Sequence, residues 1–120
     1  MNANEILDMM RKNMGSVPAA IEKSVPVDPS LIQEHMRSKA FAMPQENPAL
    51  DEATRTLIYL AAALAGTNRA CVQAMSNRLV QMGVPAAKII ETVHITRLAM
   101  ATKIIGDAEP VFEALARADK

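Results

Sequence analysis

Cys71 is the only cysteine of this 120-residue chain, with Asn68 three residues before it and Met75 four residues after it. Thr67 and Asn68 are both typical helix N-caps, which places Cys71 near the first turn of the helix that follows. Main-chain N–H groups and the helix dipole at such a position stabilise a thiolate, and Arg69 adds positive charge. One interpretation of Cys71 is therefore a reactive or ligand-contacting thiol.

The same spacing also fits a purely structural role. Cys71, Met75, Leu79 and Met82 recur at intervals of three or four residues, the pattern of apolar side chains on one buried face of a helix. In this interpretation Cys71 is a small core residue. Titration with a thiol reagent distinguishes the two interpretations, because a core cysteine reacts only after denaturation.

A second group of candidates consists of Glu91, His94 and Arg97, which stand three residues apart and can be neighbours on one helix. In a functional interpretation His94 is a catalytic acid or base, Glu91 orients it, and Arg97 holds a substrate carboxylate. The alternative is a solvated or intersubunit salt-bridge face. His35 is expected at the surface or in an interface.

No metal or other cofactor is expected. Glu91-x-x-His94 is half of a di-iron helix motif, but that site needs a second such motif and two further glutamates. His35, the only other histidine, lacks the required spacing. A single cysteine also excludes a cysteine-rich metal cage and an intrachain disulfide.

Composition limits the partners that this chain can have. Thirteen basic and thirteen acidic residues leave no net charge, and aromatic residues make up only 2%, so nucleic-acid binding is not expected. The longest apolar run, 57–65, is about half of what a membrane span needs, and the N-terminus does not resemble a secretory signal. We therefore expect a cytoplasmic protein without membrane contact.

Half of the residues are apolar, and nine are methionine. A compact monomer of this size cannot easily bury so much apolar surface, so part of it is expected to lie between subunits. The sequence thus predicts a homo-oligomer.

Caps, prolines and glycines predict an all-α fold of about six or seven helices, with no strand-type alternation. Leu57, Ile58, Leu60, Ala61 and Leu64 are predicted to line the buried face of the fourth helix. The first helix begins at an Asn2 or Asn4 cap, Asp28 and Asp51 cap two others, and Gly106-Asp107 closes the longest. The predicted ranges are 2–15, 17–24, 29–43, 51–66, 68–82, 85–105 and 107–117.

Residues 50–66, LDEATRTLIYLAAALAG, together with Cys71, resemble the active-site segment of the carboxymuconolactone decarboxylase/alkylhydroperoxidase D (AhpD-like) superfamily. Its redox members read roughly L-D-x-x-T-R-E-L-I, an apolar helix, and C-x-x-C-x-x-x-H. Here Thr56 stands at the glutamate position, Asn68 at the first cysteine position and Met75 at the histidine position. The flanking segments 14–24, 28–41 and 78–93 resemble the family in order and spacing.

This resemblance implies a single AhpD-like domain over residues 1–120, built around a helical hairpin and assembled as trimers or hexamers. It also implies either peroxidase or disulfide-reductase chemistry, or decarboxylation of a carboxylated lactone. A dithiol cycle needs a second thiol, so we expect a redox-impaired oxidoreductase in which Cys71 is recycled by an external thiol. A small apolar pocket is expected near Cys71, Thr56 and His94.

Two alternatives remain open. The first is a non-catalytic, oligomeric module that binds a small ligand. The second is a decarboxylase or related lyase that acts on a small carboxylated ring through His94 and Arg97.

Overall fold

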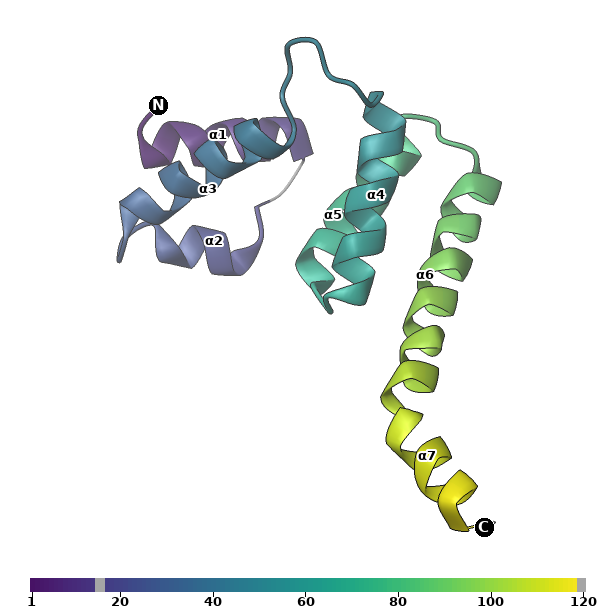
Figure 1. Ribbon diagram of the computed structural model, residues 1–120. Coiled ribbons are helices and arrows are strands. Elements are labelled where there is room, and N and C mark those ends of the chain that lie inside the picture. The colour runs from purple at the N-terminus through teal and green to yellow at the C-terminus, as the bar shows by residue number, and fades with distance from the viewer. Residues whose placement is uncertain (15–16, 119–120) are drawn as a thin grey trace. The chain divides into compact units, whose positions relative to one another are not determined.

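The computed structural model describes residues 1–14 and 17–118, which contain seven α-helices and no strand (Figure 1). The prediction of an all-α fold is therefore confirmed. The chain divides into two compact units, residues 1–55 and 56–120. The helices are α1 (Ala3–Met14), α2 (Ala19–Ser24), α3 (Pro29–Ala42), α4 (Glu52–Ala65), α5 (Arg69–Gln81), α6 (Ala86–Asp107) and α7 (Glu109–Ala118).

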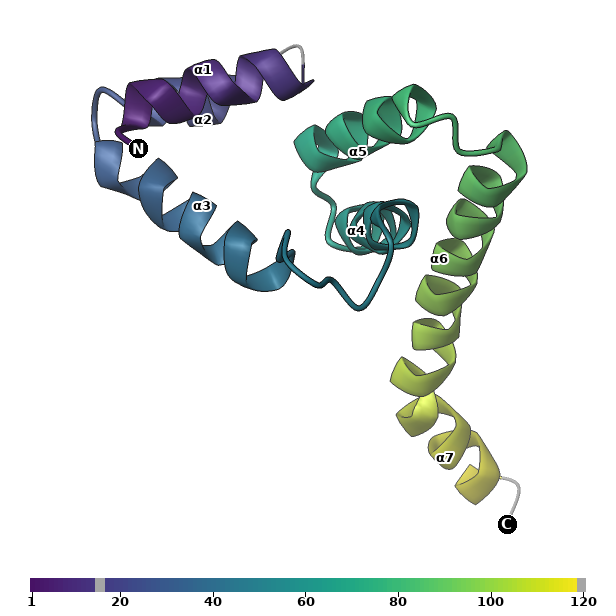
Figure 2. The ribbon, with the colours of Figure 1, turned by 90° about the horizontal axis from the view of Figure 1, so that it is seen from above.

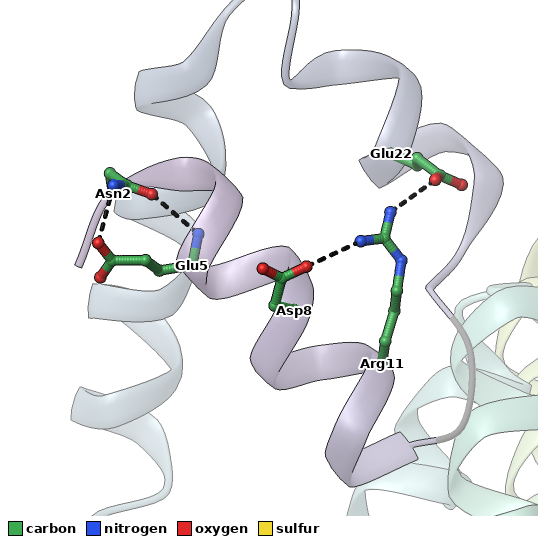
Figure 3. Close-up of polar contacts among 5 residues, drawn as sticks. All are labelled: Asn2, Glu5, Asp8, Arg11 and Glu22. Carbon is green, nitrogen blue, oxygen red and sulfur yellow. Dashed lines mark hydrogen bonds and ion pairs between the residues drawn. The ribbon is translucent and has the colours of Figure 1, made fainter.

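The first unit is a small helical cluster in which α3 packs on α1 and α2 (Figure 2). Arg11 joins α1 to α2, because its guanidinium lies 3.1 Å from Asp8 and 2.7 Å from Glu22 (Figure 3). These pairs are exposed and add little stability. Burial of apolar side chains therefore holds this unit together, and its core consists of Ala3, Ile6, Leu7, Met10, Val25 and Ile32.

Two of the predicted N-caps in this part of the chain form the expected hydrogen bonds, and one does not. The Asn2 side chain accepts a hydrogen bond from the Glu5 N–H at 2.8 Å, and Asp51 accepts one from the Thr54 N–H at 2.7 Å. Asp28 does precede α3, but its carboxylate accepts from the Ser30 hydroxyl and forms no side-chain cap.

The second unit contains α5 to α7 and, from Thr56 onward, most of α4. Its buried face on α4 differs from the prediction: Thr56, Leu60 and Ala63 are buried, whereas Ile58 is 52% exposed. These three buried residues lie at i, i+4 and i+7 on one stripe of the helix, and Ile58 lies outside it. The core side chain of α5 is Leu79, which is fully buried.

Helix α6 is the longest helix of this unit. Among its residues only Thr96 is buried, and its hydroxyl donates to the Thr92 carbonyl oxygen at 2.8 Å. The sequence predicts that this helix reaches about residue 105 and is closed by Gly106-Asp107, whereas α6 continues through Gly106 to Asp107, and Ala108 separates it from α7. An ion pair of 3.1 Å between Lys103 and Asp107 spans this last turn.

Candidate functional site

The turn between α4 and α5 fixes the position of Cys71. The chain leaves α4 at Gly66, passes through Thr67 with a φ of 58°, and enters α5 after Asn68. The side-chain oxygen of Asn68 accepts a hydrogen bond from the Cys71 N–H at 3.2 Å, which confirms Asn68 as the N-cap. Cys71 is the third residue of α5, within its first turn, as predicted.

Cys71 faces the neighbouring helix of this hairpin. Its Sγ lies 3.5 Å from the hydroxyl oxygen of Tyr59 on α4, and either atom can donate the hydrogen bond. Both residues are partly buried. The hydrogen bond to Cys71, burial and the negative charge of a neighbouring thiolate together raise the pKa of Tyr59 to about 12.

Tyr59 is therefore part of the candidate site, although the motif comparison did not select it. A signal was available in the sequence. Tyr59 is the only tyrosine of the chain, and it lies three residues after Thr56, hence on a neighbouring position of the same helix. Its contact with Cys71 joins positions twelve residues apart, and only the hairpin brings these together.

The other motif positions carry no acid–base group. Thr56 is completely buried, Asn68 caps α5, and Met75 is partly buried one turn after Cys71. Hydroxyl, amide and thioether side chains do not ionise near neutral pH, so they cannot serve as general acids or bases as glutamate and histidine do. Among the described residues, the Tyr59 phenol is the ionisable group that contacts the thiol.

A hollow of about 450 Å³ opens at the turn of this hairpin. Four of its lining residues are polar, namely Thr67, Asn68, Arg69 and Gln73. Cys71, Thr56 and His94, which were expected around a pocket, do not line this hollow. Its lining residues are Ala63, Leu64, Thr67, Asn68, Arg69, Ala70, Val72 and Gln73.

Glu91, His94 and Arg97 all lie on α6 with exposed side chains. Within residues 1–14 and 17–118, none of the three forms a side-chain hydrogen bond or ion pair. His35 is also exposed, on α3. The structure holds no group of three or more His, Cys, Asp or Glu side chains arranged to bind a metal ion in its described part.

Comparison with known proteins supports the family that the residues suggest. The family model of the carboxymuconolactone decarboxylase family matches residues 32–114, from α3 to α7. The chain belongs to this family. A search of curated proteins gave no significant match. Residues 1–31 lie outside the matched range, so a single family domain over the whole chain stays a prediction.

None of the described helices combines the length and the apolar character that crossing a membrane requires.

Proposed function

We propose that this family member carries a redox site reduced to one thiol, Cys71, which reacts slowly with peroxides and is regenerated by an external thiol. The observation that supports this proposal is the 3.5 Å contact between Cys71 Sγ and the Tyr59 hydroxyl at the start of α5. A phenol can donate a hydrogen bond to a thiolate. Such a bond stabilises the thiolate, which is the reactive form of a cysteine, and leaves the Cys71 sulfur free of any covalent bond.

The chemistry follows from a single sulfur atom. The Cys71 thiolate attacks one oxygen of a hydroperoxide, the O–O bond breaks, and the leaving alkoxide takes a proton as sulfenic acid forms on Cys71. An external thiol then displaces water from the sulfenic acid and gives a mixed disulfide. A second external thiol releases Cys71 and leaves as the oxidised disulfide.

Slow turnover is expected for two reasons. Asn68 cannot resolve the sulfenic acid as a second cysteine would, so each cycle waits for collision with an external thiol. Tyr59 cannot replace a base, because a pKa of about 12 keeps its phenol protonated at neutral pH.

The direct test of the proposed intermediate is mass spectrometry of the protein after treatment with hydrogen peroxide and a sulfenic-acid trap. Wild type is expected to gain one trap adduct, on Cys71, and Cys71→Ser none. Tyr59→Phe keeps the ring but removes the hydroxyl, and it is expected to react several-fold more slowly. Wild type without an adduct under native conditions contradicts the proposal and supports Cys71 as a core residue.

The hollow at the α4–α5 turn supports a second candidate function, binding of a small ligand without catalysis. Its volume of about 450 Å³ is within the range of small-molecule sites, and Arg69 offers a charge for a carboxylate. A thermal-shift screen of small apolar carboxylates tests this candidate, because a ligand at a hundred times its Kd stabilises by about 2.7 kcal/mol. Ala70→Phe fills the hollow and is expected to abolish any shift. A shift that persists in Ala70→Phe contradicts binding at this site.

A further inference from the structure

The charged residues around Cys71 in the sequence all have the same sign. Residues 53–90 contain no aspartate or glutamate, whereas four positions of this segment are basic, namely Arg55, Arg69, Arg78 and Lys88. The chain as a whole has no net charge, so this excess is a local property of the segment that carries the thiol. A positive potential beside a reacting group favours partners of negative charge.

Arg69 is the basic residue nearest to Cys71 along the chain. It is the first residue of α5, two positions before Cys71, and it is exposed. Among the described residues it forms no ion pair and no side-chain hydrogen bond. Arg55, by contrast, pairs with Glu52 at 2.9 Å. The guanidinium of Arg69 is therefore available to an external anion.

The start of α5 adds to the charge of Arg69. The N-terminus of a helix carries about half a positive charge on its main-chain N–H groups. Asn68, which caps this end, is neutral, and the group in contact with the sulfur is the hydroxyl of Tyr59 at 3.5 Å. Within the described residues, no carboxylate contacts Cys71. An anion that approaches its Sγ thus meets two sources of positive charge.

We propose that the external thiol that regenerates Cys71 is anionic, which means that it carries a carboxylate besides its thiol group. This inference rests on the proposed function and names the chemical class of its reductant. In the regenerating step the external thiolate attacks the disulfide between Cys71 and the first thiol. The S–S bond breaks, Cys71 leaves as a thiolate, and the two external sulfurs form a disulfide. The carboxylate takes no part in bond breaking, and its attraction to Arg69 and to the start of α5 raises the rate.

The expected effect is a moderate preference. A positive charge about 10 Å away in water changes a rate about twofold for each unit charge on the thiol, and the helix end raises this to about threefold. Anionic and cationic thiols differ by two unit charges, so their rates are expected to differ about fivefold to tenfold at low ionic strength. Salt at 1 M shortens the Debye length to about 3 Å and should remove the preference.

The regenerating step can be measured by itself. Methyl methanethiosulfonate converts Cys71 to a methyl disulfide, and intact-mass spectrometry follows its reduction by mercaptopropionate, mercaptoethanol or cysteamine. Each rate is divided by the rate for the methyl disulfide of N-acetylcysteine amide, which corrects for the basicity and nucleophilicity of each thiol. The corrected rates are expected to fall in the order anionic, neutral, cationic, with at least a fivefold difference between the first and the last.

Variants of Arg69 test the source of the preference. Arg69→Gln removes the charge and is expected to reduce the difference to about twofold, and Arg69→Glu is expected to abolish or reverse it. Lys88→Gln is the matched control, because it also removes one exposed positive charge. Lys88 follows the far end of α5, and residues 71–81 of that helix span about 15 Å. This control should keep at least a threefold difference.

Four results would overturn the proposal. They are equal corrected rates in wild type, an unchanged preference in Arg69→Gln, a preference that persists at 1 M salt, and a Cys71 that the reagent does not modify in the native protein. No peroxide enters these measurements, so they are independent of the first half of the proposed cycle. If wild type prefers the anionic thiol but forms no sulfenic acid with peroxide, the peroxide chemistry fails and the preference for an anionic thiol stands.

Discussion

The ionisation of Tyr59 gives the most sensitive readout of the contact with Cys71. The chain has one tyrosine and no tryptophan, so the ultraviolet absorbance of tyrosinate reports this single group. The hydrogen bond to Cys71, burial and the thiolate charge raise the pKa of Tyr59 to about 12. At pH 11 roughly one-tenth of the native tyrosine is ionised, against roughly nine-tenths for a free phenol with a pKa near 10.

The effect on stability has a defined sign. A raised pKa in the folded state means that the neutral phenol is favoured there. The contribution of the Tyr59–Cys71 contact to the free energy of unfolding is therefore complete below pH 10 and is lost as the pH rises through 12. A two-unit shift corresponds to about 2.7 kcal/mol. Since the Tyr59–Cys71 pair is only partly buried, screening by water reduces this to about 1–2 kcal/mol.

The perturbation is Cys71→Ala, which removes both the hydrogen bond and the thiolate charge. Its titration midpoint is expected to fall by about one unit, because burial alone still raises the pKa. Asn77→Ala, an exposed change on the same helix, is the matched control and should titrate like wild type. Circular dichroism at each pH verifies that the protein is folded. If Tyr59 of folded wild type titrates with a midpoint near pH 10, the contact between Tyr59 and Cys71 is refuted.

Further predictions concern the helix cap, the core, the thiol and His94. Asn68→Ala removes the N-cap of α5 and is expected to lower the free energy of unfolding, measured by urea denaturation, by about 1 kcal/mol. The control Asn77→Ala is expected to leave it unchanged. If the two variants are equally stable, Asn68 does not act as a cap. Leu79→Ala leaves a cavity at a fully buried position and is expected to cost about 2–5 kcal/mol, and a smaller loss would contradict its place in the core. Cys71 is expected to react with a small thiol reagent in the native protein, though more slowly than in denaturant; complete protection would favour the core interpretation. His94→Ala is expected to reduce peroxide at the wild-type rate. If wild type decarboxylates a small carboxylated ring and His94→Ala does not, the lyase alternative is supported instead.

Local features of the fold could be predicted from the sequence because their causes are local. Asn2, Asp51 and Asn68 begin helices through hydrogen bonds that span three residues, and such bonds depend on residue type and spacing. The predicted end of α6 near residue 105 is two residues short of the observed end at Asp107, because one glycine costs a helix only about 1 kcal/mol and Gly106 does not stop it. The helix continues far enough for Lys103 to pair with Asp107.

Contacts between helices could not be predicted in the same way. Helix α4 is apolar on most of its sides, so periodicity did not reveal that Ile58 is exposed and Thr56 buried. The contact between Tyr59 and Cys71 depends on how the hairpin closes, which no spacing within one helix encodes. The motif comparison located Cys71, but the residue in contact with its sulfur emerged only from the structure.

The central claim is that Cys71 is a working, if slow, redox thiol. Its most direct test is steady-state consumption of hydrogen peroxide with an excess of a small thiol, compared between wild type and Cys71→Ser. We predict slow turnover that rises in proportion to the concentration of the external thiol and falls to the uncatalysed rate in Cys71→Ser. Equal rates for the two proteins would contradict the claim.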